Sequence, residues 1–112
     1  MKIISEPSNM QILWENRDVD FTELMKVVVD VERKLLAIDA EMHADLEEIL
    51  LENGSEQKNL WGANVYPGKN IEDRIEYTSF INIRPNQNNR SMEIVSESIK
   101  NTVKEIILQL LK

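Results

Sequence analysis

A segment that runs from a strand pattern into a polar loop holds the residues best suited to chemistry. Residues 80–92 have the sequence FINIRPNQNNRSM, in which Arg84 ends an alternating stretch and Arg90 and Ser91 follow six and seven residues later. Guanidinium groups form paired hydrogen bonds with carboxylates and phosphates. If the loop curls so that Arg84, Arg90 and nearby amides converge, the sequence predicts a site for a small anion there.

Two simpler interpretations of this loop stay open. Asparagine tolerates left-handed backbone and hydrogen-bonds to its own neighbours, so the loop asparagines can serve only to shape the turn. Arg84 or Arg90 can instead pair with carboxylates of the chain itself.

The only histidine gives a second candidate site. His43 follows Asp39 and Glu41 at alternate positions of an expected strand, so the three side chains share one face. Carboxylates with a histidine suit Mg²⁺ or Mn²⁺. Neighbouring side chains on one strand face lie about 7 Å apart, however, so three of them reach one ion only if the chain bends. The alternative is that His43 is a surface or capping residue.

Strand alternation adds further polar side chains to the face that carries His43. If the apolar positions of each strand are buried, Asn64 and Asn82 lie on the opposite face together with Arg84. Antiparallel sheets often leave one face in water, so a solvated face is the simpler interpretation. The candidate binding residues are His43, Asn64, Asn82, Arg84, Asn89, Arg90 and Ser91.

Several other classes of chemistry find no support in the residues. The chain has no cysteine, which removes disulfides, thiolate metal sites and cysteine nucleophiles. Its three glycines, Gly54, Gly62 and Gly68, form no nucleotide-binding fingerprint, although Gly62 inside a strand indicates a bulge or a close approach of another group. No motif surrounds its serines, so a serine triad is not expected. We expect no cofactor.

Charge and hydropathy bear on partners and location. The formal net charge of −7 disfavours unspecific binding to the phosphate backbone of nucleic acids. No apolar run approaches the roughly 18 residues of a membrane span, and the amino terminus lacks the apolar core of a signal peptide. We therefore expect a cytoplasmic protein without membrane contacts.

The clearest structural pattern is a β-hairpin. Residues 26–43, KVVVDVERKLLAIDAEMH, alternate on both sides of a charged turn and are rich in β-branched side chains. A two-residue turn at residues 33–34 pairs Val31 with Leu36 on an apolar face. The same register pairs Val29 with Ile38, Val27 with Ala40 and, on a face expected in water, Lys26 with Glu41 and Val28 with Asp39.

Two helices follow from apolar spacing. Residues 44–55 predict a short helix, in which Asp45 and Glu48 are spaced as a capping box. From about Ser96 the chain is expected to be helical to its end. The apolar positions of this last helix are Ile99, Val103, Ile106, Ile107 and Leu110.

The remaining segments predict more strands and an amino-terminal helix. Residues 1–5 suit a short edge strand, and a helix is expected from Pro7 to about Asn16. A second pair of strands is expected around a turn at residues 67–68. Its buried positions are Trp61, Ala63 and Val65 on the first strand and Ile75, Tyr77, Ile81 and Ile83 on the second.

Together these elements predict one α+β domain over residues 1–112. The sheet is small and mainly antiparallel, with three to five strands in the order hairpin, helix, hairpin. A C-terminal helix and shorter helices pack on it. The helix after His43 can connect either parallel or antiparallel neighbours.

Four segments in this order resemble a family of small prokaryotic proteins catalogued only as a domain of unknown function. They are VVVDVERKLLAI, EMHADLEEILLENGS, LWGANVYP and FINIRPNQNNRS, and they span about Val27 to Ser91. The resemblance implies a compact single domain and brings no established activity.

For function, we expect a non-enzymatic binding or interaction module with a protein partner or a second copy of itself, and with an anionic ligand at residues 84–91. If His43 and Arg84 share one concave pocket, an enzyme is favoured instead. That alternative is a small metal-dependent or acid–base enzyme that uses His43 with Asp39 or Glu41, together with Arg84 and Arg90.

Overall fold

The chain forms one antiparallel sheet with helices on both of its faces, which confirms the predicted α+β class. The computed structural model describes residues 1–112. Its strands and α-helices are β1 (Lys2–Ile4), α1 (Met10–Glu15), β2 (Met25–Asp30), β3 (Leu35–Ile38), α2 (His43–Glu52), β4 (Leu60–Val65), β5 (Ile75–Glu76) and α3 (Glu97–Leu110). Four short 3₁₀ helices are η1 (Gln57–Asn59), η2 (Ile71–Asp73), η3 (Phe80–Asn82) and η4 (Pro85–Gln87).

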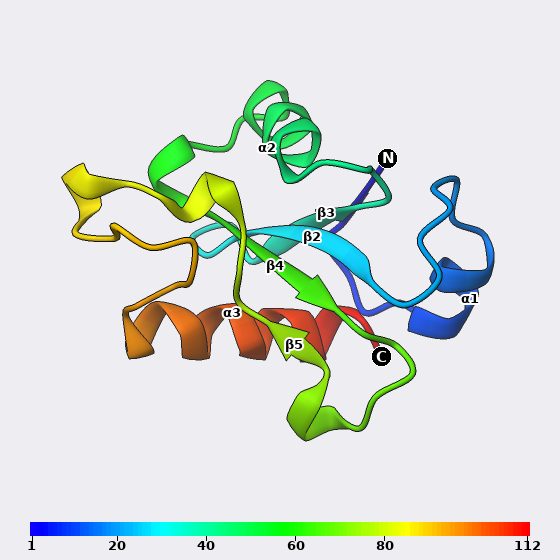
Figure 1. Cartoon of the computed structure of the whole chain (residues 1–112). Helices are drawn as coiled ribbons and strands as arrows, with labels where there is room; N and C mark the ends of the chain where they lie inside the picture. The colour runs from blue at the N-terminus through cyan, green and yellow to red at the C-terminus, as the bar shows by residue number, and fades with distance from the viewer.

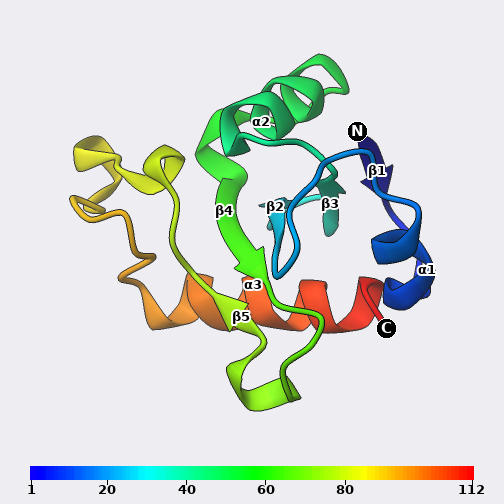
Figure 2. The ribbon, with the colours of Figure 1, turned by 45° about the vertical axis from the view of Figure 1, so that its right-hand side comes forward.

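The strand order of the sheet is β1-β3-β2-β4-β5, and every neighbouring pair is antiparallel. Because β3 and β4 both run antiparallel to β2, they run parallel to each other. The helix α2 therefore carries the chain over β2, between two parallel strands that are not neighbours. Figure 1 and Figure 2 show α2 on one face of the sheet and α3 on the other.

The larger of two apolar cores lies between the sheet and the helices α1 and α3. It contains 16 buried residues, among them Val27 and Val29 of β2 and Val103 and Ile107 of α3. The side chain of Ser96 accepts a hydrogen bond from the backbone N–H of Ile99 at 3.2 Å and so caps α3. None of the helices is long and apolar enough to cross a membrane.

A second apolar core lies on the face that was expected to be in water, so that prediction is wrong. Val28, Ala37, Leu46 and Leu50 are fully buried there. The helix α2 covers this face, and Ile81 of η3 packs against the same cluster. Both faces of the central strands are therefore buried, which explains why β2 contains three consecutive valines.

The register of the first hairpin differs by two residues from the prediction. The structure pairs Val29 with Leu36 and Val27 with Ile38, around a turn of four residues instead of two. Asp30 causes this longer turn, because its Oδ1 atom accepts the backbone N–H groups of residues 32 and 33, both at 2.9 Å. A shift of two residues keeps the side chains of the paired strands on their predicted faces. Ala40, which was expected opposite Val27, is an exception, because it follows the end of β3 and lies in the second core.

Two predicted element boundaries are also wrong. The capping box of Asp45 and Glu48 does not form, because α2 begins at His43 and its cap residue, Met42, makes no side-chain cap hydrogen bond. The last strand was expected to reach Ile83, but β5 ends at residue 76.

Beyond β5 the chain makes a long excursion, residues 77–94, which we call the arm. The two sides of the arm are joined by hydrogen bonds from Ser79 N to Met92 O at 3.0 Å and from Ile94 N to Tyr77 O at 3.1 Å. Figure 1 shows the arm in yellow and orange, leading from β5 to the start of α3. The predicted loop of residues 84–91 is its tip.

Candidate functional site

The arm is attached to the edge of β4 by the side chain of Asn82, which is fully buried. Its Oδ1 accepts the N–H of Gly62 at 2.8 Å, and its Nδ2 donates to the carbonyl oxygens of Gly62 and Met92, both at 3.0 Å. A carboxamide has the same donor and acceptor as a peptide group, so Asn82 replaces one residue of a neighbouring strand. All these contacts are with the protein itself.

Asn89 has a similar role inside the arm. Its Nδ2 donates to the carbonyl oxygens of residues 82, 91 and 93 at 2.8 to 2.9 Å, and its Oδ1 accepts the N–H of Val95 at 2.9 Å. Only 2% of Asn89 is exposed. The two asparagines thus supply the backbone partners that a β-ladder supplies elsewhere, and this leaves neither of them free to face a ligand.

Arg84 points into the protein instead of into a shared site with Arg90. Its Nε donates to Ile81 O at 3.0 Å, its Nη1 to Gln57 O at 2.9 Å, and its Nη2 to Leu60 O and to the carboxylate of Glu47. Burial lowers the pKa of Arg84, and the negative charge of Glu47 opposes that effect. Arg84 therefore connects β4, α2 and the arm, in line with the simpler interpretation of pairing within the chain.

The other candidates in the arm and on β4 lie apart from Arg84. Arg90 is exposed and makes no side-chain hydrogen bond, and Ser91 Oγ accepts the N–H of Glu93 at 3.0 Å. Asn64 Nδ2 donates to Glu76 Oε1 at 2.8 Å, while its buried Oδ1 has no partner. The predicted convergence of two guanidinium groups on an anion is not present.

Gly62 is the point of closest approach between β4 and the arm, as a glycine inside a strand indicated. A Cβ atom on Gly62 would lie 2.5 Å from Ser79 Cβ and 3.2 Å from His43 Cδ2. The missing side chain lets the arm and the first residue of α2 meet over the strand.

His43 lies at this meeting point as the first residue of α2. Its Nε2 is 2.8 Å from Ala63 O. Because a carbonyl oxygen only accepts, Nε2 carries the proton and donates, and Nδ1 of the neutral ring is unprotonated. Burial lowers the pKa of His43, the bond to Ala63 raises it, and Lys26 lowers it further. The net effect is a pKa below the usual 6.5, so the ring is neutral at pH 7.

This burial predicts that acid weakens the fold through His43. The unfolded chain, with its ordinary histidine pKa, binds the proton more readily than the folded chain does, so the contribution of His43 is complete above pH 6.5 and is lost as the pH falls through the lower, folded pKa. Urea midpoints of the natural protein should therefore fall between about pH 7.5 and about pH 5.5. His43→Gln keeps an N–H donor without the titration and should show a smaller fall. Equal falls in both proteins would contradict this assignment.

The predicted metal ligands are not brought together. Asp39 has a left-handed backbone, with φ of 73°, and its carboxylate accepts the backbone N–H groups of Asp18 and Val19. Glu41 is exposed and His43 is bound to Ala63. No three histidine, aspartate or glutamate side chains in the chain are grouped to hold a metal ion.

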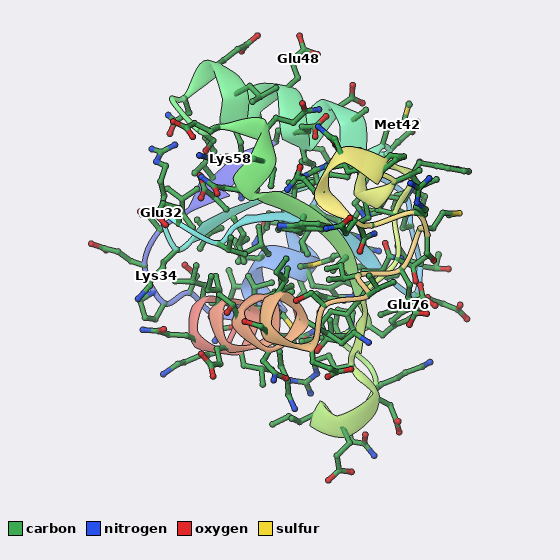
Figure 3. The ribbon with its side chains drawn as sticks, turned by 90° about the vertical axis from the view of Figure 1, so that its left-hand side faces the viewer. Glu32, Lys34, Met42, Glu48, Lys58 and Glu76 are labelled. Carbon is green, nitrogen blue, oxygen red and sulfur yellow. The ribbon has the colours of Figure 1, made fainter.

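A groove of about 240 Å³ opens between the first turn of α2 and the arm, and we call it the Phe80 groove. Phe80 on its rim is 76% exposed and Met42 is 57% exposed, whereas His43 and Ser79 are buried. Figure 3 shows Met42 beside the yellow ribbon of the arm. The residues that line the groove are Lys26, Met42, His43, Ala44, Ser79, Phe80 and Ile81. His43 thus faces this groove, but Arg84 and Arg90 do not.

Phe80 and Met42 were not among the predicted site residues. The sequence did mark Phe80 as unusual. It is an apolar residue between Ser79 and Ile81, at a position where strand alternation expects a polar side chain. Met42 had a weaker signal, since an apolar residue directly before a helix is common and need not be exposed.

Residues 2–110 match a family model described as Protein of unknown function (DUF5674). No curated protein and no solved structure matches the chain.

Proposed function

The chain belongs to the DUF5674 family of proteins of unknown function, and we propose that it is a non-enzymatic interaction domain that pairs with a second copy of itself through the Phe80 groove. The observation that carries this proposal is the 76% exposure of Phe80 beside a groove with a mainly apolar lining. Aromatic and methionine side chains are enriched at the centres of protein interfaces.

The structure around Phe80 supports a preformed contact. The residue before it, Ser79, is buried, and Ser79 Oγ accepts the N–H of Ile81 at 3.3 Å. Asn82, two residues after Phe80, is fixed to β4 by its side chain. An anchor whose backbone is already ordered loses little conformational entropy on binding, so more of its apolar burial contributes to affinity.

Self-pairing is favoured because the exposed side chain of Phe80 lies directly beside the Phe80 groove. In a two-fold dimer each copy presents the same patch, so Phe80 of one copy can enter the groove of its partner while the partner's Phe80 enters the first. The net charge of −7 on each copy opposes this contact. Pairing driven by apolar burial should therefore tighten as salt screens the repulsion.

Sedimentation equilibrium over a range of concentrations tests the proposal. The natural protein should change from the 13.0 kDa monomer towards twice that mass as its concentration rises. Phe80→Ser removes the anchor and should weaken pairing roughly 30-fold, the equivalent of about 2 kcal/mol. Met42→Ser should have the same direction of effect.

Ile71 offers a matched control, because it is also 57% exposed and does not line the groove. Ile71→Ser should pair like the natural protein. A natural protein that stays monomeric at every concentration would overturn self-pairing, and so would equal effects of the Met42 and Ile71 substitutions.

A further inference from the structure

A buried carboxylate with one free oxygen lies at the opposite end of β2 from the Phe80 groove. Asp30 is the last residue of β2 and is fully buried. Its Oδ1 accepts two backbone N–H groups in the hairpin turn, whereas its buried Oδ2 has no hydrogen-bond partner. Burying a carboxylate oxygen without a partner is costly, so such an atom points to a group that approaches it.

Asp30 lines a hollow of about 400 Å³ that has no hydrophobic residue in its walls. Its lining residues are Asp30, Glu32, Arg33, Gly54, Glu56, Lys58 and Asn59. Figure 3 shows Glu32 and Lys58 on the flank of the molecule away from Met42. The hollow is therefore separate from the proposed dimer surface.

The two cations of the hollow do not neutralise Asp30. Lys58 Nζ pairs with Glu56 at 3.4 Å, and the guanidinium of Arg33 donates to Ser55 Oγ and Asn53 Oδ1, both at 2.9 Å. No ion pair joins Asp30 to either of them. With Lys58 paired to Glu56, the two carboxylates of Asp30 and Glu32 outnumber the one charge of Arg33, so the lining favours a cation.

We propose that this hollow binds a primary ammonium group, with Asp30 Oδ2 as its acceptor. Because that atom is buried, the side chains over it must move aside as the ammonium group enters. Only one carboxylate oxygen is free, which suits the single-point contact of an ammonium better than the two-point contact of a guanidinium. A metal ion is a poorer match, since no three acidic or histidine side chains are grouped to hold one. Glu32 at the wall adds attraction for the same charge.

The test is an NMR titration of the ¹⁵N-labelled natural protein with methylammonium chloride at constant ionic strength. Saturable shifts are expected at the amides of Glu32 and Arg33, because both donate to Asp30 Oδ1. Tetramethylammonium has the same charge and no N–H donor, and it should give no saturable shift. Equal responses to the two cations would overturn the proposal.

Asp30→Asn supplies the matched variant. Asparagine forms the same turn through its Oδ1, so the hairpin is kept while the charge and the free acceptor are lost. Affinity for methylammonium should fall about tenfold or more, and unchanged affinity would contradict the role of Asp30. If this variant does not fold, Glu32→Gln should still weaken binding severalfold.

A second ligand distinguishes two sources of the ammonium group, a lysine side chain of a partner and a small free amine. Tighter binding of Nα-acetyl-lysinamide than of methylammonium would assign the site to a lysine side chain of a partner. Similar binding of both would assign it to a small free amine. The proposal is independent of self-pairing, because Phe80→Ser should leave these shifts unchanged.

Discussion

Replacing Asn82 with alanine is expected to destabilise the fold by about 3 kcal/mol or more. The substitution leaves two buried backbone groups without a partner, the N–H and carbonyl of Gly62, and the carbonyl of Met92 keeps only its bond from Ser79 N. Each unsatisfied buried group costs about 1 to 3 kcal/mol. Chemical denaturation followed by circular dichroism measures this loss as a lower midpoint at an unchanged slope.

The arm contains a suitable control for this substitution. Asn86 is exposed and its side chain makes no hydrogen bond, so Asn86→Ala should change stability by less than about 0.5 kcal/mol. Asn82→Asp keeps the acceptor for Gly62 N but places a negative charge against two carbonyl oxygens, and it should also destabilise. If Asn82→Ala were as stable as the natural protein, Asn82 would be better explained as a ligand residue.

Gly62→Ala is expected to cost about 1 to 3 kcal/mol by overpacking, and more if the arm cannot move. The new methyl group would lie 2.5 Å from Ser79 Cβ and 2.7 Å from Ser79 Oγ, closer than atoms of folded proteins approach. The arm or the start of α2 must then shift. A lower denaturation midpoint should therefore be accompanied by large amide shifts at Ser79 and His43.

Gly68 is the control for Gly62, because a Cβ atom there would meet nothing within 4 Å. Gly68→Ala should be neutral or should stabilise by a few tenths of a kcal/mol through the unfolded chain. Combining Gly62→Ala with Ser79→Gly removes the closest contact and should restore part of the stability. No recovery in the double variant would mean that the clash lies elsewhere.

Elements with a strong local period could be predicted from the sequence. The helix α3 has apolar residues at helical spacing and a serine cap, and both are local signals. The alternation of β2 and β3 predicted correctly which side chains of these strands share a face, since a period of two depends only on the strand itself. Register was harder to predict, because one buried side chain, Asp30, decides the length of the turn.

The second apolar core could not be predicted from alternation alone. In the sequence, Val28 and Ala37 share their face of the sheet with charged residues, so alternation gives no reason to expect that face to be buried. The crossing of α2 over β2 is what covers them. The arm raised a related difficulty. Its local sequence continues the strand pattern past Glu76, but the close approach at Gly62 turns the chain out of the sheet, and this is a contact between distant residues.

The candidate site was predicted by residue type, and the same types served a structural purpose. Asn82, Asn89 and Arg84 are suited to bind ligands because they present several donors and acceptors. In the arm, the same donors and acceptors form hydrogen bonds with backbone groups that have no partner in a β-ladder. Composition cannot separate the two roles, since the difference lies in which way each side chain points.

The placement of α3 at the end of the chain has a consequence for folding during synthesis on the ribosome. The sheet strands β1 to β4 are complete at Val65, but the helix that covers Val27, Val29 and Trp61 ends 45 residues later, at Leu110. At about 5 to 20 residues per second, that apolar face stays uncovered for about 2 to 9 s of translation. Each nascent chain thus passes through an interval in which chaperones, or another unfinished chain, can reach its future interior.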